Sequence, residues 1–256
     1  MNNKRHFVLV HGACHGAWCW YKVVPLLKSS RHKVTALDMA ASGVHPKQVH
    51  DLDSIEDYYE PLIQFLRSLP QEERVILVGH SYGGICISVA TELFPKKIAV
   101  AVFVASRVPS PELGFETARK EGSNFESKII LDDSSNNKSN GSILHEPEFI
   151  ASHMYQLSPP EDFSLAMLLL RPIRTFGDQE LFREKTRVSK ENFGAVAKVC
   201  IVCQQDKLSK YDFQMSMIEQ NPVNDVKVIA DADHMAMFSK PQELFAYFQE
   251  IAETYY

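Results

Sequence analysis

The sequence lacks the features that mark several protein classes. No apolar run in its 256 residues approaches the roughly 20 residues that a membrane-spanning helix needs. Its 27 lysines and arginines are outnumbered by 32 aspartates and glutamates, and this balance argues against nucleic acid or an anionic membrane as a partner. The first apolar run, residues 7–10, is too short for the core of a signal peptide. We therefore expect neither a nucleic-acid nor a membrane partner.

Cysteine is also scarce, and the five cysteines show no disulfide pattern. Without an export signal, their number favours a reducing, cytoplasmic location. Cys200 and Cys203 spell C-x-x-C, but they lie in an apolar, β-branched run in which residues three apart face opposite sides of a strand. We interpret both as core residues. No second pair or nearby histidine completes a zinc set, so we expect no metal and no cofactor.

Short apolar runs alternate with longer segments whose apolar residues have helical spacing. The expected strands are residues 7–10, 34–37, 75–78, 98–104, 199–202 and 226–229, and the expected helices are 18–28, 55–69, 83–94, 210–220 and 241–254. Near-continuous apolar strands that alternate with helices are typical of a parallel sheet covered on both faces. The sequence thus predicts an α/β fold, with a mostly parallel sheet of about six strands.

One segment interrupts this alternation. Residues 107–190 contain six prolines and the polar run 132–141, and a simple strand-to-helix connection needs far fewer residues. We interpret 107–190 as an inserted lid, or cap, over the active site. Residues 1–106 and 191–256 then form the α/β core.

The sequence Gly79-His-Ser-Tyr-Gly83 follows the third expected strand and precedes a helix. A G-x-S-x-G sequence in this context is typical of a nucleophile elbow, a tight turn that presents serine above the sheet edge. A serine hydroxyl needs a neighbouring base, which a third group must orient. Ser81 is therefore the candidate nucleophile.

In this fold the acid and then the histidine follow the serine along the chain. His234 comes after the last expected strand and Asp206 after the one before it, so we predict both as partners of Ser81. We expect His80 to have a structural role and to point away from the nucleophile, and His145 to be solvated. His153 lies in the lid, and for this residue a position in the pocket lining is left open. Four other aspartates are less favoured candidates for the acid role: Asp38, Asp178, Asp231 and Asp233.

An oxyanion hole needs one N–H group from the residue after the nucleophile and one from the loop after the first strand. The residue after Ser81 is Tyr82. The loop reads His11-Gly-Ala-Cys-His-Gly, in which Gly12 permits a sharp turn and Ala13 is the expected second donor.

The chain resembles the plant methylesterase and hydroxynitrile lyase family of the α/β-hydrolase superfamily. The resemblance covers nearly the whole chain and rests on long strings: HFVLVHGACHGAWCWYK (6–22), VTALDMAASGVHPK (34–47), VGHSYGG (78–84), AVAVFV (99–104), QLSPPEDFSLA (156–166) and ADHMAMFSKPQEL (232–244). It implies the same triad, Ser81, Asp206 and His234, with Ala13 and Tyr82 as oxyanion donors. Segment 107–150 departs from the family, and there we expect substrate choice to be encoded.

The resemblance implies a serine carboxylesterase that hydrolyses the methyl ester of a small plant metabolite through an acyl-enzyme. Related enzymes act on the methyl esters of salicylate, jasmonate and indole-acetate, or on alkaloid esters. The similar lyases carry threonine at the position of Gly12 and lysine at that of Met235, so a lyase is the less favoured alternative. The other alternative is a ligand receptor on the same fold with little turnover.

An apolar ester needs an apolar pocket. We predict that Gly12 and lid residues contact the substrate, namely Phe125, Met154, Tyr155, Phe163 and Leu168. The expected partner is a small-molecule ester, and a homodimer is left open.

Overall fold

The computed structural model describes residues 4–112, 114–115 and 141–256. Its central sheet has six strands in the order β2-β1-β3-β4-β7-β8, and every pairing is parallel. The strands are β1 (His6–Val10), β2 (Lys33–Leu37), β3 (Val75–His80), β4 (Ile98–Val104), β7 (Ala197–Cys203) and β8 (Asp225–Ile229). Each expected strand is present, and the predicted fold class is confirmed.

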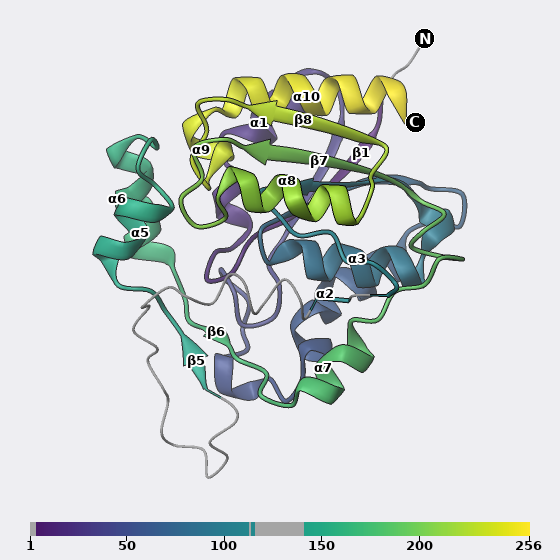
Figure 1. Ribbon diagram of the computed structural model, residues 1–256, viewed down its shortest axis with the longest axis horizontal. Helices are drawn as coiled ribbons and strands as arrows, with labels where there is room; N and C mark the ends of the chain where they lie inside the picture. The colour runs from purple at the N-terminus through teal and green to yellow at the C-terminus, as the bar shows by residue number, and fades with distance from the viewer. Residues whose placement is uncertain (1–3, 113, 116–140) are drawn as a thin grey trace.

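Helices cover both faces of the sheet (Figure 1). One face carries α1 (Val23–Ser29) and α10 (Pro241–Thr254), which contact each other. The other face carries α2 (Ile55–Ser68), α3 (Gly83–Leu93) and α8 (Tyr211–Gln220). The helix expected over residues 18–28 is divided into a 3₁₀ turn, Ala17–Trp20, and α1. Further 3₁₀ turns are Val49–Asp51 and Pro95–Lys97, and α9 is Ala236–Ser239.

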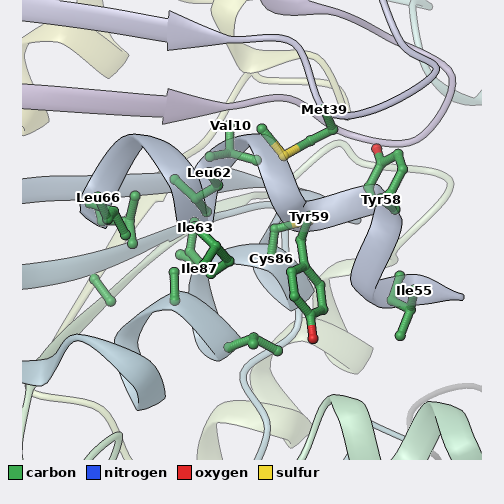
Figure 2. Packing of buried hydrophobic residues seen from close by; sticks show 14 of the residues in the cluster. Val10, Met39, Ile55, Tyr58, Tyr59, Leu62, Ile63, Leu66, Cys86 and Ile87 are labelled. Carbon is green, nitrogen blue, oxygen red and sulfur yellow. The ribbon is translucent and has the colours of Figure 1, made fainter. Parts of the chain in front are cut away.

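Alternation along the strands divides the core into two layers. Phe7 and Leu9 of β1 pack towards the α1 and α10 side, whereas Val8 and Val10 pack towards α2 and α3. Figure 2 shows the second layer, where side chains of α2 lie beside Cys86 and Ile87 of α3. This burial on both faces explains why the strands have nearly continuous apolar sequences.

The two cysteines of the C-x-x-C sequence follow the same alternation. Cys200 belongs to the layer on the α3 side and Cys203 to the layer on the α10 side. Both are buried free thiols. The prediction that they are separate core residues is confirmed.

The segment between β4 and β7 contains short elements. They are β5 (Ser142–Ile143), α5 (Pro147–His153), α6 (Pro160–Leu169), β6 (Ile173–Arg174) and α7 (Gln179–Lys185). The antiparallel pair β5–β6 was not predicted, because two-residue strands leave no periodicity in the sequence. Within the described ranges, no helix combines the length and the apolar character that crossing a membrane requires.

Polar contacts tie α5 and α6 to the core. The buried carboxylate of Asp162 accepts a hydrogen bond from the Tyr21 hydroxyl at 2.5 Å and pairs with the Lys22 ammonium group. Asp233, in the loop after β8, accepts hydrogen bonds from the Leu157 N–H and the Ser158 hydroxyl, both at 2.9 Å. These contacts hold residues 157–162 against the loops that follow β1 and β8.

Candidate active site

Ser81 lies in the turn between β3 and α3, in the left-handed region with φ of +50°. The flanking glycines make this turn possible. A Cβ atom on Gly79 would lie 2.8 Å from the Gly83 carbonyl oxygen, and one on Gly83 would lie 2.6 Å from the His11 carbonyl oxygen. Both distances are shorter than real Cβ contacts, so the tight turn requires glycine at these two positions.

The structure brings together the three side chains that the sequence predicts as a triad. The Ser81 Oγ lies 3.0 Å from His234 Nε2, and His234 Nδ1 lies 2.7 Å from Asp206 Oδ2. All three follow the carboxyl ends of parallel strands, where α/β sheets place their ligand sites. Because a carboxylate can only accept, Nδ1 carries the proton and Nε2 accepts from the serine hydroxyl. This tautomer leaves His234 able to take the serine proton.

Neighbouring groups fix the orientation of both partners of Ser81. The second oxygen of Asp206 accepts hydrogen bonds from the backbone N–H groups of Leu208 and Ser209, both at 2.8 Å. His80 Nε2 donates to the His234 carbonyl oxygen at 2.8 Å. Burial lowers the pKa of His80 well below its ordinary value, so this ring is neutral and holds the His234 backbone.

The four less favoured aspartates have partners outside the triad. Asp206 is the one of the five candidates that contacts His234 Nδ1 among the described residues. The others organise loops and helix ends through these contacts: Asp38 accepts from the Ala17 N–H, Asp178 from the Leu181 N–H and Asp233 from the Met235 N–H, whereas Asp231 lies 3.5 Å from the Lys240 ammonium group.

Two cavities of unequal size meet at Ser81. The larger has a volume of about 340 Å³ and the smaller about 40 Å³. Residues that border both are Ala13, Ser81, His145, Leu208 and His234. The larger one has a largely apolar lining that includes Ile85, Phe115, Ile143, Ile173, Phe176 and Phe182. The smaller one includes Gly12, Cys14, Leu144, Ile150, Met154 and Leu170.

The residues expected to supply oxyanion donors are next to the serine. Ala13 borders both cavities, and Tyr82 borders the larger one at the beginning of α3. Gly12 has no room for a side chain, because a Cβ atom would lie 2.8 Å from His80 Nδ1 and 3.1 Å from Ser81 Cβ. Met235 is fully buried in the core and is absent from the linings of both cavities.

The predicted substrate-contacting residues have mixed outcomes. Met154 and Gly12 line the smaller cavity. Three of the predicted residues are outside the linings of both cavities, and their contact with substrate stays a prediction. The Tyr155 hydroxyl lies 2.6 Å from His15 Nε2 within the core, and Phe163 packs against the same core layer. Leu168 is 82% exposed on α6. Phe125 lies outside the described residues.

Sequence reasoning missed several residues of the larger cavity. His145 was expected to be solvated, but it borders both cavities, and burial lowers its pKa. His153, the alternative for this role, stacks on Phe149 instead, with ring centroids 4.4 Å apart. Ile143 and Ile173 reach the cavity through the unpredicted β5–β6 pair. Their apolar character was a weak signal, because the partner strand is remote in sequence.

A serine held in a strand-to-helix turn and hydrogen-bonded to a histidine, which an aspartate in turn orients, is the arrangement of an α/β hydrolase. The sequence matches the profile of the alpha/beta hydrolase family over residues 7–247, and the chain belongs to this family. The resemblance inferred from the sequence is thereby confirmed.

Among curated relatives, methyl jasmonate esterase 1 from Vitis vinifera is 52% identical over 98% of both chains. Methylesterase 3 from Arabidopsis thaliana is 45% identical over 98% of this chain and 97% of its own. Among solved structures, polyneuridine aldehyde esterase has a TM-score of 0.90 at 38% identity, covering 97% of this chain and 99% of its own. These three relatives are esterases of similar length, and the two curated ones come from plants.

Proposed function

We propose that the protein is a serine carboxylesterase that hydrolyses the methyl ester of a small plant metabolite, as its esterase relatives suggest. The single observation that carries the proposal is the Ser81–His234–Asp206 chain at the junction of the two cavities. The name of the methyl jasmonate esterase points to a hormone-type ester as the first substrate to test.

In the proposed reaction, Ser81 Oγ attacks the ester carbonyl carbon and its proton passes to His234 Nε2. Asp206 holds the imidazole tautomer and stabilises its positive charge. The backbone N–H groups of Ala13 and Tyr82 face the oxyanion. Methoxide leaves with the proton from His234 as methanol. Water, deprotonated by His234, then attacks the acyl-enzyme, releasing the acid and restoring the serine hydroxyl.

The unequal cavities support a methyl ester over esters of larger alcohols. A volume of about 40 Å³ exceeds the roughly 10–15 Å³ that one water requires, so the smaller cavity accepts a methoxy group. The larger cavity then takes the acyl group, and its apolar lining matches an apolar metabolite.

The nucleophile is tested with Ser81→Ala. We expect kcat for methyl ester hydrolysis to fall by about 10⁴-fold or more, as for loss of a triad serine, with unchanged thermal unfolding. Ser88→Ala is the matched control, because Ser88 lies in α3, the helix that follows Ser81, and its hydroxyl donates to the Gly84 carbonyl oxygen. Retention of esterase activity by Ser81→Ala refutes the assignment. A single slow acylation without product release in the wild type favours the receptor alternative.

The role of the smaller cavity is tested with methyl, ethyl, propyl and butyl esters of one acid. We expect kcat/KM to fall steeply beyond the ethyl ester, and Met154→Ala, which enlarges this cavity, to reduce the fall. Met217→Ala removes a buried methionine from α8 and is the control. Equal rates for all four esters contradict the assignment of the two cavities.

The lyase alternative is less consistent with the site. The similar lyases carry threonine at the position of Gly12, and the contacts at Gly12 leave no space for that side chain in this arrangement. Met235 offers no charge to stabilise a departing cyanide ion. Cleavage of mandelonitrile by the wild-type protein at a rate comparable to ester hydrolysis would overturn this preference.

A further inference from the structure

One charged side chain in the larger cavity is not used by the proposed hydrolysis. Arg174 belongs to β6 and lines the larger cavity, but it is absent from the lining of the smaller one. Its Nε atom is buried and has no hydrogen-bond partner among the described residues. A buried donor without an acceptor is unfavourable, and in native structures such groups usually have a function or an unseen partner.

The surroundings of Arg174 make the unpaired donor more unusual. Much of the lining of this cavity is aliphatic or aromatic, including Ile143, Ile173 and Phe176. The other arginine that borders it, Arg107, lies over the ring of Phe213 at 5.2 Å, which is a favourable position for a cation. Arg174 has no such ring contact or ion pair among the described residues.

The chemistry of the guanidinium group restricts what it can recognise. Arginine has N–H donors and no acceptor, and it stays charged in proteins. A ligand group that satisfies it must therefore be an acceptor oxygen, such as a ketone or a carboxylate. A charged donor in a partly buried, largely apolar cavity makes a stronger hydrogen bond than a fully exposed one does.

The position of Arg174 assigns that oxygen to one part of the substrate. The groups at the reaction centre, Ser81 and His234, border both cavities, whereas Arg174 borders only the larger one, which we assign to the acyl group. We propose that Arg174 is a specificity-determining residue that binds an acceptor oxygen on the acyl group, remote from the ester. This inference rests on the proposed esterase function and narrows its substrate class to methyl esters with an apolar body and a second oxygen function.

The kinetic test compares three methyl esters: methyl 3-oxocyclopentaneacetate, methyl cyclopentaneacetate and monomethyl pimelate. They carry a ketone, no second oxygen and a carboxylate, respectively. We expect the wild type to prefer at least one oxygen-bearing ester by about tenfold or more in kcat/KM, the value of a hydrogen bond to a charged group. Arg174→Met should remove this preference, because kcat/KM should fall for the oxygen-bearing ester relative to the apolar one.

Arg187→Met is the control, since Arg187 is exposed and outside the linings of both cavities. The ester whose preference is lost shows whether the recognised oxygen is neutral or anionic. The same preference in the wild type and in Arg174→Met overturns the proposal. Wild-type protein that hydrolyses none of the three esters in a Ser81-dependent way instead contradicts the esterase function.

A binding measurement tests the role of Arg174 independently of the esterase function, because it needs no turnover. Calorimetry with Ser81→Ala should show tighter binding of the preferred oxygen-bearing ester than of the apolar one. The double variant Ser81→Ala with Arg174→Met should bind both equally. If the double variant keeps the difference, or if Ser81→Ala shows none, Arg174 does not recognise the substrate.

Discussion

The loop that carries His234 depends on Asp233, and Asp233→Asn should weaken both the fold and catalysis. The Asp233 side chain is fully buried, and one of its oxygens accepts from the Leu157 N–H and the Ser158 hydroxyl. Its other oxygen accepts from the Met235 N–H at 3.0 Å. This carboxylate therefore joins the insertion to both sides of His234 in the chain.

The magnitude follows from counting donors. Asparagine has one acceptor oxygen, so its NH₂ group must face either the Met235 N–H or the pair of donors from Leu157 and Ser158. At least one hydrogen bond is lost, two donors oppose each other, and the remaining bonds lose the help of the charge. We expect the free energy of unfolding to fall by about 2–3 kcal/mol. For a chain of this size, this lowers Tm by about 5–10 °C.

Urea unfolding and kcat/KM for a methyl ester measure the two effects. Asp231→Asn is a closely matched control: the same substitution two residues away, at a side chain that is 77% exposed. We expect Asp231→Asn to change stability by less than about 0.5 kcal/mol, as at other surface sites. Equal unfolding midpoints for the two variants refute the argument. Loss of stability with full kcat/KM shows that Asp233 anchors the insertion without positioning His234.

Three other perturbations test separate contacts. Gly12→Ala places a methyl group against His80 Nδ1 and Ser81 Cβ. Overpacking of this kind should lower the free energy of unfolding by about 1–3 kcal/mol, and displacement of the nucleophile should lower kcat/KM. Unchanged stability and kinetics contradict the steric argument. Asp206→Asn should lower kcat by about 10⁴-fold, because the amide favours the wrong tautomer of His234. Single-turnover assays measure this fall, and a much smaller one contradicts the role of Asp206. Burial lowers the pKa of His15 from 6.5 to about 3. Between these pH values the imidazole binds a proton in the unfolded chain but not in the folded protein, so the free energy of unfolding falls as the pH drops below 6.5. This residue alone should account for about 1.5 kcal/mol between pH 6.5 and about 5, and urea unfolding of His15→Gln should show a pH slope smaller by about one proton.

The strands and the three residues of the triad could be predicted because their signals are local. The strands of a sheet that is buried on both faces are continuous apolar runs, such as residues 98–104, and their boundaries are sharp in the sequence. The Ser81 turn carries its glycines within five residues. Asp206 and His234 lie in the loops that follow β7 and β8, so parallel topology alone places them at the edge that holds Ser81.

The cavity lining could not be predicted in the same way, because it depends on contacts between segments that are remote in sequence. Tyr155 and Leu168 are both large residues of the segment between β4 and β7, yet one packs in the core and the other faces solvent. Helix α6 has apolar residues on most of its surface, so its sequence does not show which side is buried. His145 follows the β5–β6 pair into the cavity, and a two-residue strand has no recognisable pattern.

The positive φ of Ser81 sets function against stability at a single residue. A non-glycine residue in the left-handed region is strained by about 1 kcal/mol or more, and glycine relieves this strain. Ser81→Gly should consequently abolish hydrolysis while folding at least as stably as the wild type. Selection for thermal stability alone therefore favours loss of the nucleophile at this position, and an active chain in this family retains a residue that its own backbone disfavours.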